Sequence, residues 1–484
     1  MMDCDTCIRN ASVFDGSGGD AEPLDVALRD GRIFDVGPSL QCNAPQVVEA
    51  EGLSLAPGFI DAHTHDDLEV IRQPAMVAKL SQGVTTVVTG NCGISAAPVQ
   101  LRGTLPEPMN LLGDAGEFRY STFAAYVDAI QSAQPSVNVG ALVGHTALRS
   151  NHLVQLDRAA TGPEIAAMRT QLIEALESGA LGLSTGLAYG TAFAASIEEL
   201  LALAQPLASA GAIYATHMRT ESDGIRDAMR EAFTVGKTCG VPVVVSHLKC
   251  AGIANWGRSG EVLQALEEAR KQQSAGCDCY PYVASSTTLD LRQVDARIDI
   301  TITWSTSHPE KAGRSLGQIA KEWGVTQREA ARRLQPAGAI YHNMAEEDMR
   351  HILAHPATMI GSDGLPCDPR PHPRLWGTFP RVLGKYSRDE KLMPLAVAIH
   401  KMTAMPAQRF GLDGRGMIRQ GYAADLVLFN AEKIIDTATF ADPIQPAKGI
   451  EGVWVNGALS YKADGATGDR AGRFLPRSRT AWSQ

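Results

Sequence analysis

The stretch from Leu55 to His65 reads Leu-Ala-Pro-Gly-Phe-Ile-Asp-Ala-His-Thr-His, an apolar run that closes on a His-x-His motif. Side chains two residues apart on a strand point to the same face, so His63 and His65 can reach one metal ion from the end of the strand. The alternative is a pair of hydrogen-bonded histidines in the core. In parallel α/β barrels the chemistry lies at the C-terminal ends of strands, which is where this motif falls.

Further β-rich runs follow this stretch, and helical segments separate them. The runs occupy Gly83–Gly93, Val137–His145, Gly179–Gly186, Gly211–Arg219, Val241–Lys249, Gly276–Tyr282 and Thr358–Gly364. Amphipathic segments such as Gly162–Glu177 and Arg258–Gln273 lie between them. This alternation predicts the α/β class, with a (β/α)8 TIM-like barrel at its centre.

Both ends of the chain differ from this middle region. Short alternating runs such as Asp25–Arg29 and Asp425–Phe429 are typical of antiparallel strands. We therefore expect residues 1–54 and 414–484 to form one small β-sandwich domain and residues 55–413 to form a metal-dependent hydrolase barrel. The connection after the seventh strand is too long for a simple loop, and we expect residues 285–357 to form an insertion that covers the active site as a lid.

Charge and cysteine content narrow the class of protein. The 484 residues include 44 Lys and Arg against 53 Asp and Glu, a net charge of −9 that disfavours binding to nucleic acid or to an anionic membrane. The sequence lacks the run of about 18 apolar residues that a membrane-spanning helix needs. Nine cysteines scattered over so long a chain do not resemble a disulfide framework, so we expect a cytoplasmic location. The oligomeric state stays open.

More potential metal ligands fall at the ends of predicted strands. Cys92 ends the second strand, His217 the fifth, His247 the sixth and Asp363 the eighth. Each has a structural alternative when taken alone, since a cysteine is often a small buried hydrophobe and a histidine can be a core residue. Because strand ends meet at one mouth of a barrel, these residues and the His-x-His motif together predict a metal site.

These residues match the metal signature of the amidohydrolase superfamily, which the chain resembles over essentially its whole length. Many members carry a carboxylated lysine on strand four, but the fourth run here, Gly182–Gly186, has no lysine, and Cys92 stands on strand two instead. Together with the motifs at Gly83–Gly93, Ile360–Pro366 and His372–Gly384, this combination resembles the D-aminoacylase family of N-acyl-D-amino acid deacylases.

The resemblance implies zinc-dependent hydrolysis of an N-acyl-D-amino acid to a D-amino acid and a carboxylate. It implies a tight zinc on Cys92, His217 and His247 and a second, weaker position on His63, His65 and Asp363, with Cys92 shared between the two positions as an alternative. Three protein ligands leave an open coordination position, and zinc lowers the pKa of a bound water to about 7.

The resemblance also implies roles in catalysis. Asp363 would take the proton of the attacking water and deliver it to the departing amine. Tyr189, just beyond strand four, would stabilise the oxyanion of the tetrahedral intermediate. His145, at the end of strand three, is the alternative for that role, unless it is a satisfied structural histidine.

Substrate recognition follows from the same resemblance. The residues expected to bind the α-carboxylate are Lys249, Tyr280, Ser286 and Arg374. Arg292, at the start of the insertion, would favour an acidic side chain such as that of D-glutamate if it is buried in the pocket. The alternatives are an exposed Arg292 paired with Asp290 and a preference for neutral substrates.

Two other classes of protein are weighed against this one. A cyclic-amide hydrolase related to hydantoinase would usually carry the strand-four lysine that is missing here. A metal-binding scaffold without activity would be expected to lose the carboxylate that moves protons, yet Asp363 is present.

Overall fold

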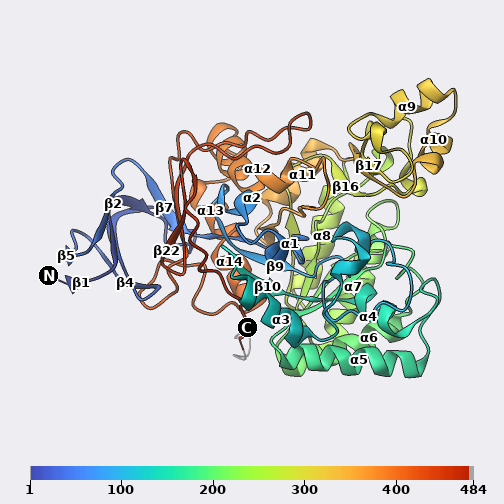
Figure 1. Ribbon diagram of the computed structural model, residues 1–484, viewed down its shortest axis with the longest axis horizontal. Coiled ribbons are helices and arrows are strands. Elements are labelled where there is room, and N and C mark those ends of the chain that lie inside the picture. The colour runs from blue at the N-terminus through green and yellow to red at the C-terminus, as the bar shows by residue number, and fades with distance from the viewer. Residues whose placement is uncertain (1, 479–484) are drawn as a thin grey trace.

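The computed structural model describes residues 2–478 and contains the predicted barrel (Figure 1). Its strands in chain order are β8 (Phe59–Asp61), β9 (Val84–Thr89), β10 (Asn138–Ala141), β11 (Val143–Gly144), β12 (Gly182–Gly186), β13 (Ile213–His217), β14 (Val243–Val245), β15 (Ala275–Cys279) and β19 (Thr358–Ile360). Only Leu142 separates β10 from β11, so the two are parts of one barrel strand. Paired barrel strands run parallel. The barrel closes where Ala62 N donates to Ile360 O at 3.2 Å.

Helices surround the barrel strands (Figure 1). They are α1 (Glu69–Arg72), α2 (Val77–Leu80), α3 (Phe123–Ala133), α4 (His145–His152), α5 (Gly162–Glu177), α6 (Ile197–Ala210), α7 (Ile225–Cys239), α8 (Ser259–Arg270), α11 (Glu346–Ala354), α12 (Arg374–Arg381), α13 (Leu395–Lys401) and α14 (Ala404–Phe410). Local sequence sets their limits. Thr161 and Glu164 form a capping box at the start of α5, and Gly240, with a φ of +68°, ends α7 in the left-handed region.

The two ends of the chain build a nine-stranded sheet beside the barrel, at the left of Figure 1. Its strands are β2 (Thr6–Val13), β3 (Glu22–Arg29), β4 (Arg32–Gly37), β6 (Gln46–Glu49), β7 (Ser54–Pro57), β20 (Leu426–Phe429), β21 (Ile450–Val455), β22 (Ala458–Lys462) and β23 (Gly465–Ala466). A separate pair joins β1 (Met2–Asp3) and β5 (Cys42–Asn43). The antiparallel pairing of β7 with β20 joins the N-terminal and C-terminal halves of the sheet.

The boundary between this sheet and the barrel differs from the sequence expectation. Leu55–Pro57 was expected to begin the first barrel strand, but Ser54–Pro57 forms β7 of the terminal sheet, and the barrel strand begins at Phe59. Gly58 lies between them, and its backbone passes so close to Thr85 that a Cβ there would lie 2.2 Å from a side-chain carbon. One continuous apolar run therefore serves two sheets, which its hydrophobicity alone does not reveal.

The insertion after β15 forms a small lobe of its own. It contains β16 (Ser285–Thr288), β17 (Ile300–Ser305), β18 (Ala337–Tyr341), α9 (Leu316–Trp323) and α10 (Gln327–Leu334). Figure 1 shows α9 and α10 projecting away from the barrel. The lobe ends earlier than expected, because α11 (Glu346–Ala354) packs on barrel helix α8 and strand β19 and so belongs to the barrel. The sequence could not show this, because the amphipathic pattern of α11 is the same whether its apolar face packs on the lobe or on the barrel.

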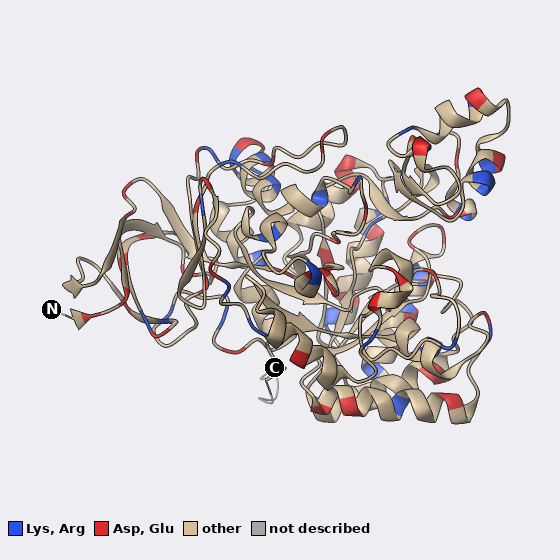
Figure 2. Cartoon of the chain, in the orientation of Figure 1, with Lys and Arg blue, Asp and Glu red and all other residues tan. Residues whose placement is uncertain are grey.

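Charged side chains of both signs are interspersed over the barrel helices and the insertion (Figure 2). Among residues 2–478, no helix combines the length and the apolar character needed to cross a membrane.

Candidate active site and metal centre

A cavity of about 560 Å³ opens where the barrel strands end. Its walls come from strand ends and from the first residues of the insertion. The lining includes ten residues that the sequence assigns to metal binding, catalysis or substrate binding: His65, Cys92, Tyr189, His217, His247, Lys249, Tyr280, Ser286, Arg292 and Asp363. The folded chain therefore brings side chains nearly 300 positions apart in the sequence into one pocket.

Cys92 lies at the centre of the potential metal ligands. Its Sγ is 3.2 Å from Nε2 of His63 and 3.2 Å from Nε2 of His247. Asp363 Oδ1 is 3.5 Å from His63 Nε2 and 3.1 Å from His65 Nε2. Ligand atoms of His63, Cys92, His247 and Asp363 all lie within 4.8 Å of one another. The strand ends therefore converge as the sequence predicts.

His217 lies next to His247 and Tyr189. Its ring centroid is 4.5 Å from that of His247 and 5.0 Å from that of Tyr189. With Glu221 and His247 it forms a second group whose ligand atoms lie within 4.8 Å of one another. His247 therefore belongs to both groups of potential ligands.

The backbone is turned sharply at three of these residues. Cys92, His247 and Asp363 have φ angles of +52°, +36° and +49°, in the left-handed region that residues with a Cβ seldom adopt. Such a conformation costs about 1–3 kcal/mol at each position and persists only where the surrounding structure enforces it. Local strain at these three residues is therefore part of how the centre is built.

Two carboxylates that the sequence prediction missed orient the imidazoles. Asp278 Oδ1 accepts a hydrogen bond from the backbone N–H of His247 at 2.9 Å and lies 3.2 Å from Nδ1 of His63. Glu221 Oε1 is 2.9 Å from Nδ1 of His247. A carboxylate on the far nitrogen fixes which nitrogen of a histidine faces a metal. Their places in the sequence could have indicated this role, because Asp278 lies on barrel strand β15 and Glu221 follows the end of β13 by four residues.

The residues expected to bind the α-carboxylate gather around one aromatic ring. Arg374 lies 4.6 Å from the ring centroid of Tyr280, and Lys249 Nζ lies 5.8 Å from it. The hydroxyl oxygens of Tyr280 and Ser286 are buried without a protein partner in the described structure. Because a buried hydroxyl without a partner is costly, these two are groups that a polar ligand can satisfy.

Lys249 and Arg374 already have anionic neighbours, and of the two only Lys249 lines the cavity. Arg374 is 1% exposed, and its Nη1 lies 2.8 Å from Asp363 Oδ2. Lys249 Nζ donates to Glu221 Oε1 at 2.6 Å and lies 2.7 Å from His247 Nδ1. Arg374 is therefore placed to hold the Asp363 carboxylate as well as to contribute positive charge.

The two candidates for oxyanion stabilisation lie in different surroundings. Tyr189 lines the cavity, and its hydroxyl is 3.3 Å from Thr287 Oγ1 of the insertion. His145 is fully buried, and its Nε2 lies 2.8 Å from Glu199 Oε1. Burial lowers the pKa of His145 even though Glu199 raises it. The place of Tyr189 on the cavity wall favours it as the group that stabilises the oxyanion. His145 is instead buried and paired with Glu199, which is the structural role that the sequence left open for it.

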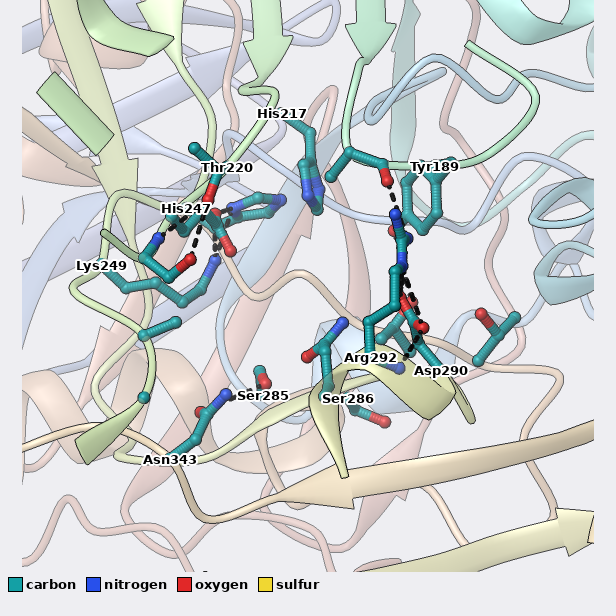
Figure 3. A pocket seen from close by; sticks show the side chains of 18 of the residues that line it. Tyr189, His217, Thr220, His247, Lys249, Ser285, Ser286, Asp290, Arg292 and Asn343 are labelled. Atoms are coloured by element: carbon teal, nitrogen blue, oxygen red, sulfur yellow. Dashed lines mark hydrogen bonds and ion pairs between the residues drawn. The ribbon is translucent and has the colours of Figure 1, made fainter. Parts of the chain in front are cut away.

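Arg292 lines the cavity but is not buried. Its side chain is 61% exposed and pairs with Asp290 at 2.7 Å, while Nη2 also donates to Ala188 O at 3.1 Å (Figure 3). The expectation of a buried arginine is therefore wrong, and the exposed pair with Asp290 that was its alternative is present. A two-residue turn supplies the reason, because Asp290 also accepts the backbone N–H of Arg292 at 2.8 Å.

The electrostatics favour ionised ligands. Burial raises the pKa of the Cys92 thiol, but the imidazoles of His63, His247 and His217 outweigh burial and hold that pKa well below its ordinary value. Burial likewise raises the pKa of Asp363, and Arg374 and the neighbouring histidines more than offset it, leaving that pKa well below its usual range. A thiolate and a carboxylate beside several imidazoles form a donor set that suits a divalent cation.

The spacing of the donors also fits zinc. Zinc bonds of about 2.3 Å to sulfur and about 2.1 Å to nitrogen place tetrahedral neighbours roughly 3.5 Å apart, close to the 3.2 Å from Cys92 to His63 and to His247. The mixed sulfur, nitrogen and oxygen set suits zinc better than magnesium or calcium, which prefer oxygen alone. The ligand atoms within 4.8 Å of one another belong to His63, Cys92, His247 and Asp363, and in a second group to His217, Glu221 and His247. The division into one ion on Cys92, His217 and His247 and a second on His63, His65 and Asp363 stays a prediction.

Comparisons with known proteins agree with this geometry. The model of the Amidohydrolase family matches residues 46–280 and 259–461. The chain is 48% identical to D-aminoacylase (98% of each chain), 47% identical to N-acyl-D-aspartate deacylase (99% of this chain, 97% of the relative) and 44% identical to N-acyl-D-glutamate deacylase (98% and 96%), all from Alcaligenes xylosoxydans xylosoxydans.

Solved structures agree as well. A crystal structure of D-aminoacylase superposes with a TM-score of 0.96 at 47% identity, covering 98% of this chain and all of the other. N-acyl-D-glutamate deacylase from Bordetella bronchiseptica, solved with zinc and a phosphonate mimic of the tetrahedral intermediate, superposes with a TM-score of 0.95 at 43% identity over the same shares.

Proposed function

The chain belongs to the N-acyl-D-amino acid deacylases of the amidohydrolase family, and from this premise we propose that it hydrolyses the amide bond of N-acyl-D-amino acids with zinc as its tightly bound metal. The observation that carries the proposal is the convergence of Cys92, His247 and Asp363 at the mouth of the barrel. The strand-four segment Gly182–Gly186 has no lysine, which argues against a cyclic-amide hydrolase.

Asp363 is assigned as the catalytic acid and base. Its ion pair with Arg374 holds the carboxylate at the cavity wall and keeps it ionised, so it can accept a proton from the attacking water. Returned to the nitrogen, that proton lets the amine depart as a neutral molecule. Zinc, when bound, polarises the acyl carbonyl and makes hydroxide available near neutral pH.

Tyr189 and the residues around the Tyr280 ring are assigned to positioning the substrate. The Tyr189 hydroxyl lies on the cavity wall, where it can donate to the oxygen that becomes negative when water adds to the carbonyl. Lys249, Tyr280, Ser286 and Arg374 supply charges and hydroxyls for the α-carboxylate, which needs such partners to leave water.

For the substrate side chain we propose an acidic group such as that of D-glutamate, bound against Arg292. Arg292 is not buried, so burial gives no support; support comes from the place of its guanidinium on the cavity wall and from relatives whose names specify D-aspartate and D-glutamate. A second candidate, neutral substrates, is favoured by the Asp290 carboxylate, which already neutralises Arg292.

A panel of N-acetyl D- and L-amino acids with acidic and neutral side chains tests both levels of the proposal. Zinc-loaded protein should hydrolyse the D enantiomers, and failure on all of them, or equal rates on the L enantiomers, would refute the function. If Arg292 binds the side-chain carboxylate, Arg292→Leu lowers kcat/KM for N-acetyl-D-glutamate selectively, while Asp290→Asn raises it. Unchanged profiles in both variants would favour neutral substrates.

The substrates of this proposal are small molecules, and no partner macromolecule is invoked. The cysteines are all free thiols, which supports the cytoplasmic location that the composition predicts.

A further inference from the structure

A fully buried lysine lies beneath the mouth of the barrel, outside the cavity. Lys79, on α2, has no exposed side-chain surface. Its Nζ donates to Asp61 Oδ2 at 2.7 Å, to Thr64 Oγ1 at 2.9 Å and to Ser362 Oγ at 3.0 Å. An ammonium group has three N–H donors, so all of them are used. These three hydrogen bonds link α2 to Asp61 and Thr64 on one segment and to Ser362 on another.

The charge of Lys79 is balanced by two carboxylates. Asp61 accepts one of its hydrogen bonds, and Asp66 Oδ2 lies 3.1 Å from Nζ. Burial lowers the pKa of Lys79, but these two carboxylates outweigh burial and raise it, so the ammonium group stays charged. Buried charges are seldom kept unless paired, and here the pairing crosses from one segment of the chain to another.

The two hydroxyls that Lys79 contacts are neighbours of metal ligands. Thr64 stands between His63 and His65, and Ser362 immediately precedes Asp363. Both hydroxyls accept from the same ammonium group, so Nζ ties the segment after β8 to the segment after β19. These segments meet where the barrel closes and where regular strand pairing has ended.

Ser362 is held through its backbone N–H and its hydroxyl. Its N–H and its hydroxyl donate to the two oxygens of Asp61, at 2.8 Å and 2.6 Å. Its Oγ also accepts from the N–H of Gly364 at 3.1 Å. These bonds bracket Asp363, whose φ of +49° requires external restraint, and whose own N–H donates to His63 O at 2.6 Å.

We propose that Lys79 is a positioning residue, which with Asp61 and Ser362 sets the distance between the His63–His65 segment and Asp363. The proposal rests on the proposed function for its catalytic consequence. The group that Lys79 positions is the donor set of the second metal position together with the catalytic carboxylate. None of the network atoms needs to touch the substrate for this effect.

The test compares Ser362→Ala, Thr64→Val and Lys79→Met with a matched control, Thr358→Val. Thr358 is a buried hydroxyl residue on β19 itself, bonded to Cys277 Sγ at 3.2 Å and away from the cavity lining. Three quantities are measured: the affinity for a second Zn²⁺ titrated by calorimetry into the one-zinc protein, and kcat and KM of the one-zinc protein on N-acetyl-D-amino acids.

We expect the network variants to bind the second ion about 10- to 100-fold more weakly. We expect kcat to fall by a similar factor while KM changes less than about threefold. The control loses stability against urea but keeps the parental second-ion affinity, kcat and KM. Because Lys79→Met leaves two carboxylates unpaired and can fail to fold, Ser362→Ala and Thr64→Val decide the matter in that case.

The proposal is overturned if the folded network variants match Thr358→Val in both second-ion affinity and kcat. If the parent protein hydrolyses no N-acyl-D-amino acid, the proposed function fails, and the second-ion affinity still decides the role of Lys79.

Discussion

Replacing Glu199 by Gln tests how much a buried carboxylate near the Tyr189 loop contributes to the free energy of unfolding. Glu199 on α6 is fully buried, and its Oε1 lies 2.8 Å from His145 Nε2 and accepts a hydrogen bond from Arg149 Nη1 at 2.5 Å. Arg149 also donates through Nε to Thr191 O at 2.9 Å, in the loop that carries Tyr189. The substitution keeps the shape of the side chain and removes its charge.

The size of the effect follows from the ionisation of Glu199. Burial raises its pKa, but the contacts with His145 and Arg149 outweigh burial and lower it from 4.5 to about 2. Since each pKa unit corresponds to about 1.4 kcal/mol, the folded state favours the ionised form by about 3 kcal/mol. Leaving one partner of a buried pair uncompensated costs about 3–5 kcal/mol, which agrees. We therefore expect Glu199→Gln to lose at least about 3 kcal/mol of unfolding free energy.

Urea unfolding at pH 7 measures this loss, and Glu198→Gln is the matched control because Glu198 is the exposed neighbour on the same helix. The contribution of Glu199 is present above pH 4.5 and is lost as the pH falls through about 2, so parent and variant should converge in stability over that interval. A midpoint for Glu199→Gln equal to that of Glu198→Gln would refute the reasoning.

Other expected outcomes concern the centre itself. Asp363→Asn should lower kcat about 10²- to 10⁴-fold, because the proton acceptor is lost, with zinc content measured alongside; a variant that keeps parental kcat would remove Asp363 from its assigned role. Removing metal with a chelator should abolish hydrolysis and added zinc should restore it, whereas full activity of metal-free protein would exclude a role for the ion. Lys249→Met should lower kcat/KM about 10- to 100-fold, mostly through KM, because one charge-assisted hydrogen bond to the substrate is lost; a change confined to kcat would point to its contact with His247.

Much of the centre could be predicted because the barrel gives strand ends a common destination. His63, Cys92, His217, His247 and Asp363 each follow a β run, and a parallel barrel brings such positions to one mouth. The position of each residue at the end of its strand was therefore enough to predict that these side chains meet, without knowledge of which strands contact each other.

The residues that the sequence did not predict act through contacts that cannot be inferred from their positions on strands. Asp278 and Glu221 orient ligands that come from other strands, and Lys79 comes from a short helix with no motif. The exposure of Arg292 was decided by a local turn with Asp290, a competition between neighbours that composition cannot settle. The placement of α11 depended on which surface its apolar face meets.

The central claim is that donors from separate strands meet around one ion, with Cys92 among them. Zinc X-ray absorption spectroscopy of the one-zinc protein tests it directly. We predict one sulfur neighbour at about 2.3 Å together with nitrogen or oxygen neighbours at about 2.0–2.1 Å, and loss of the sulfur neighbour in Cys92→Ser. A folded one-zinc protein whose spectrum contains no sulfur neighbour would contradict the account.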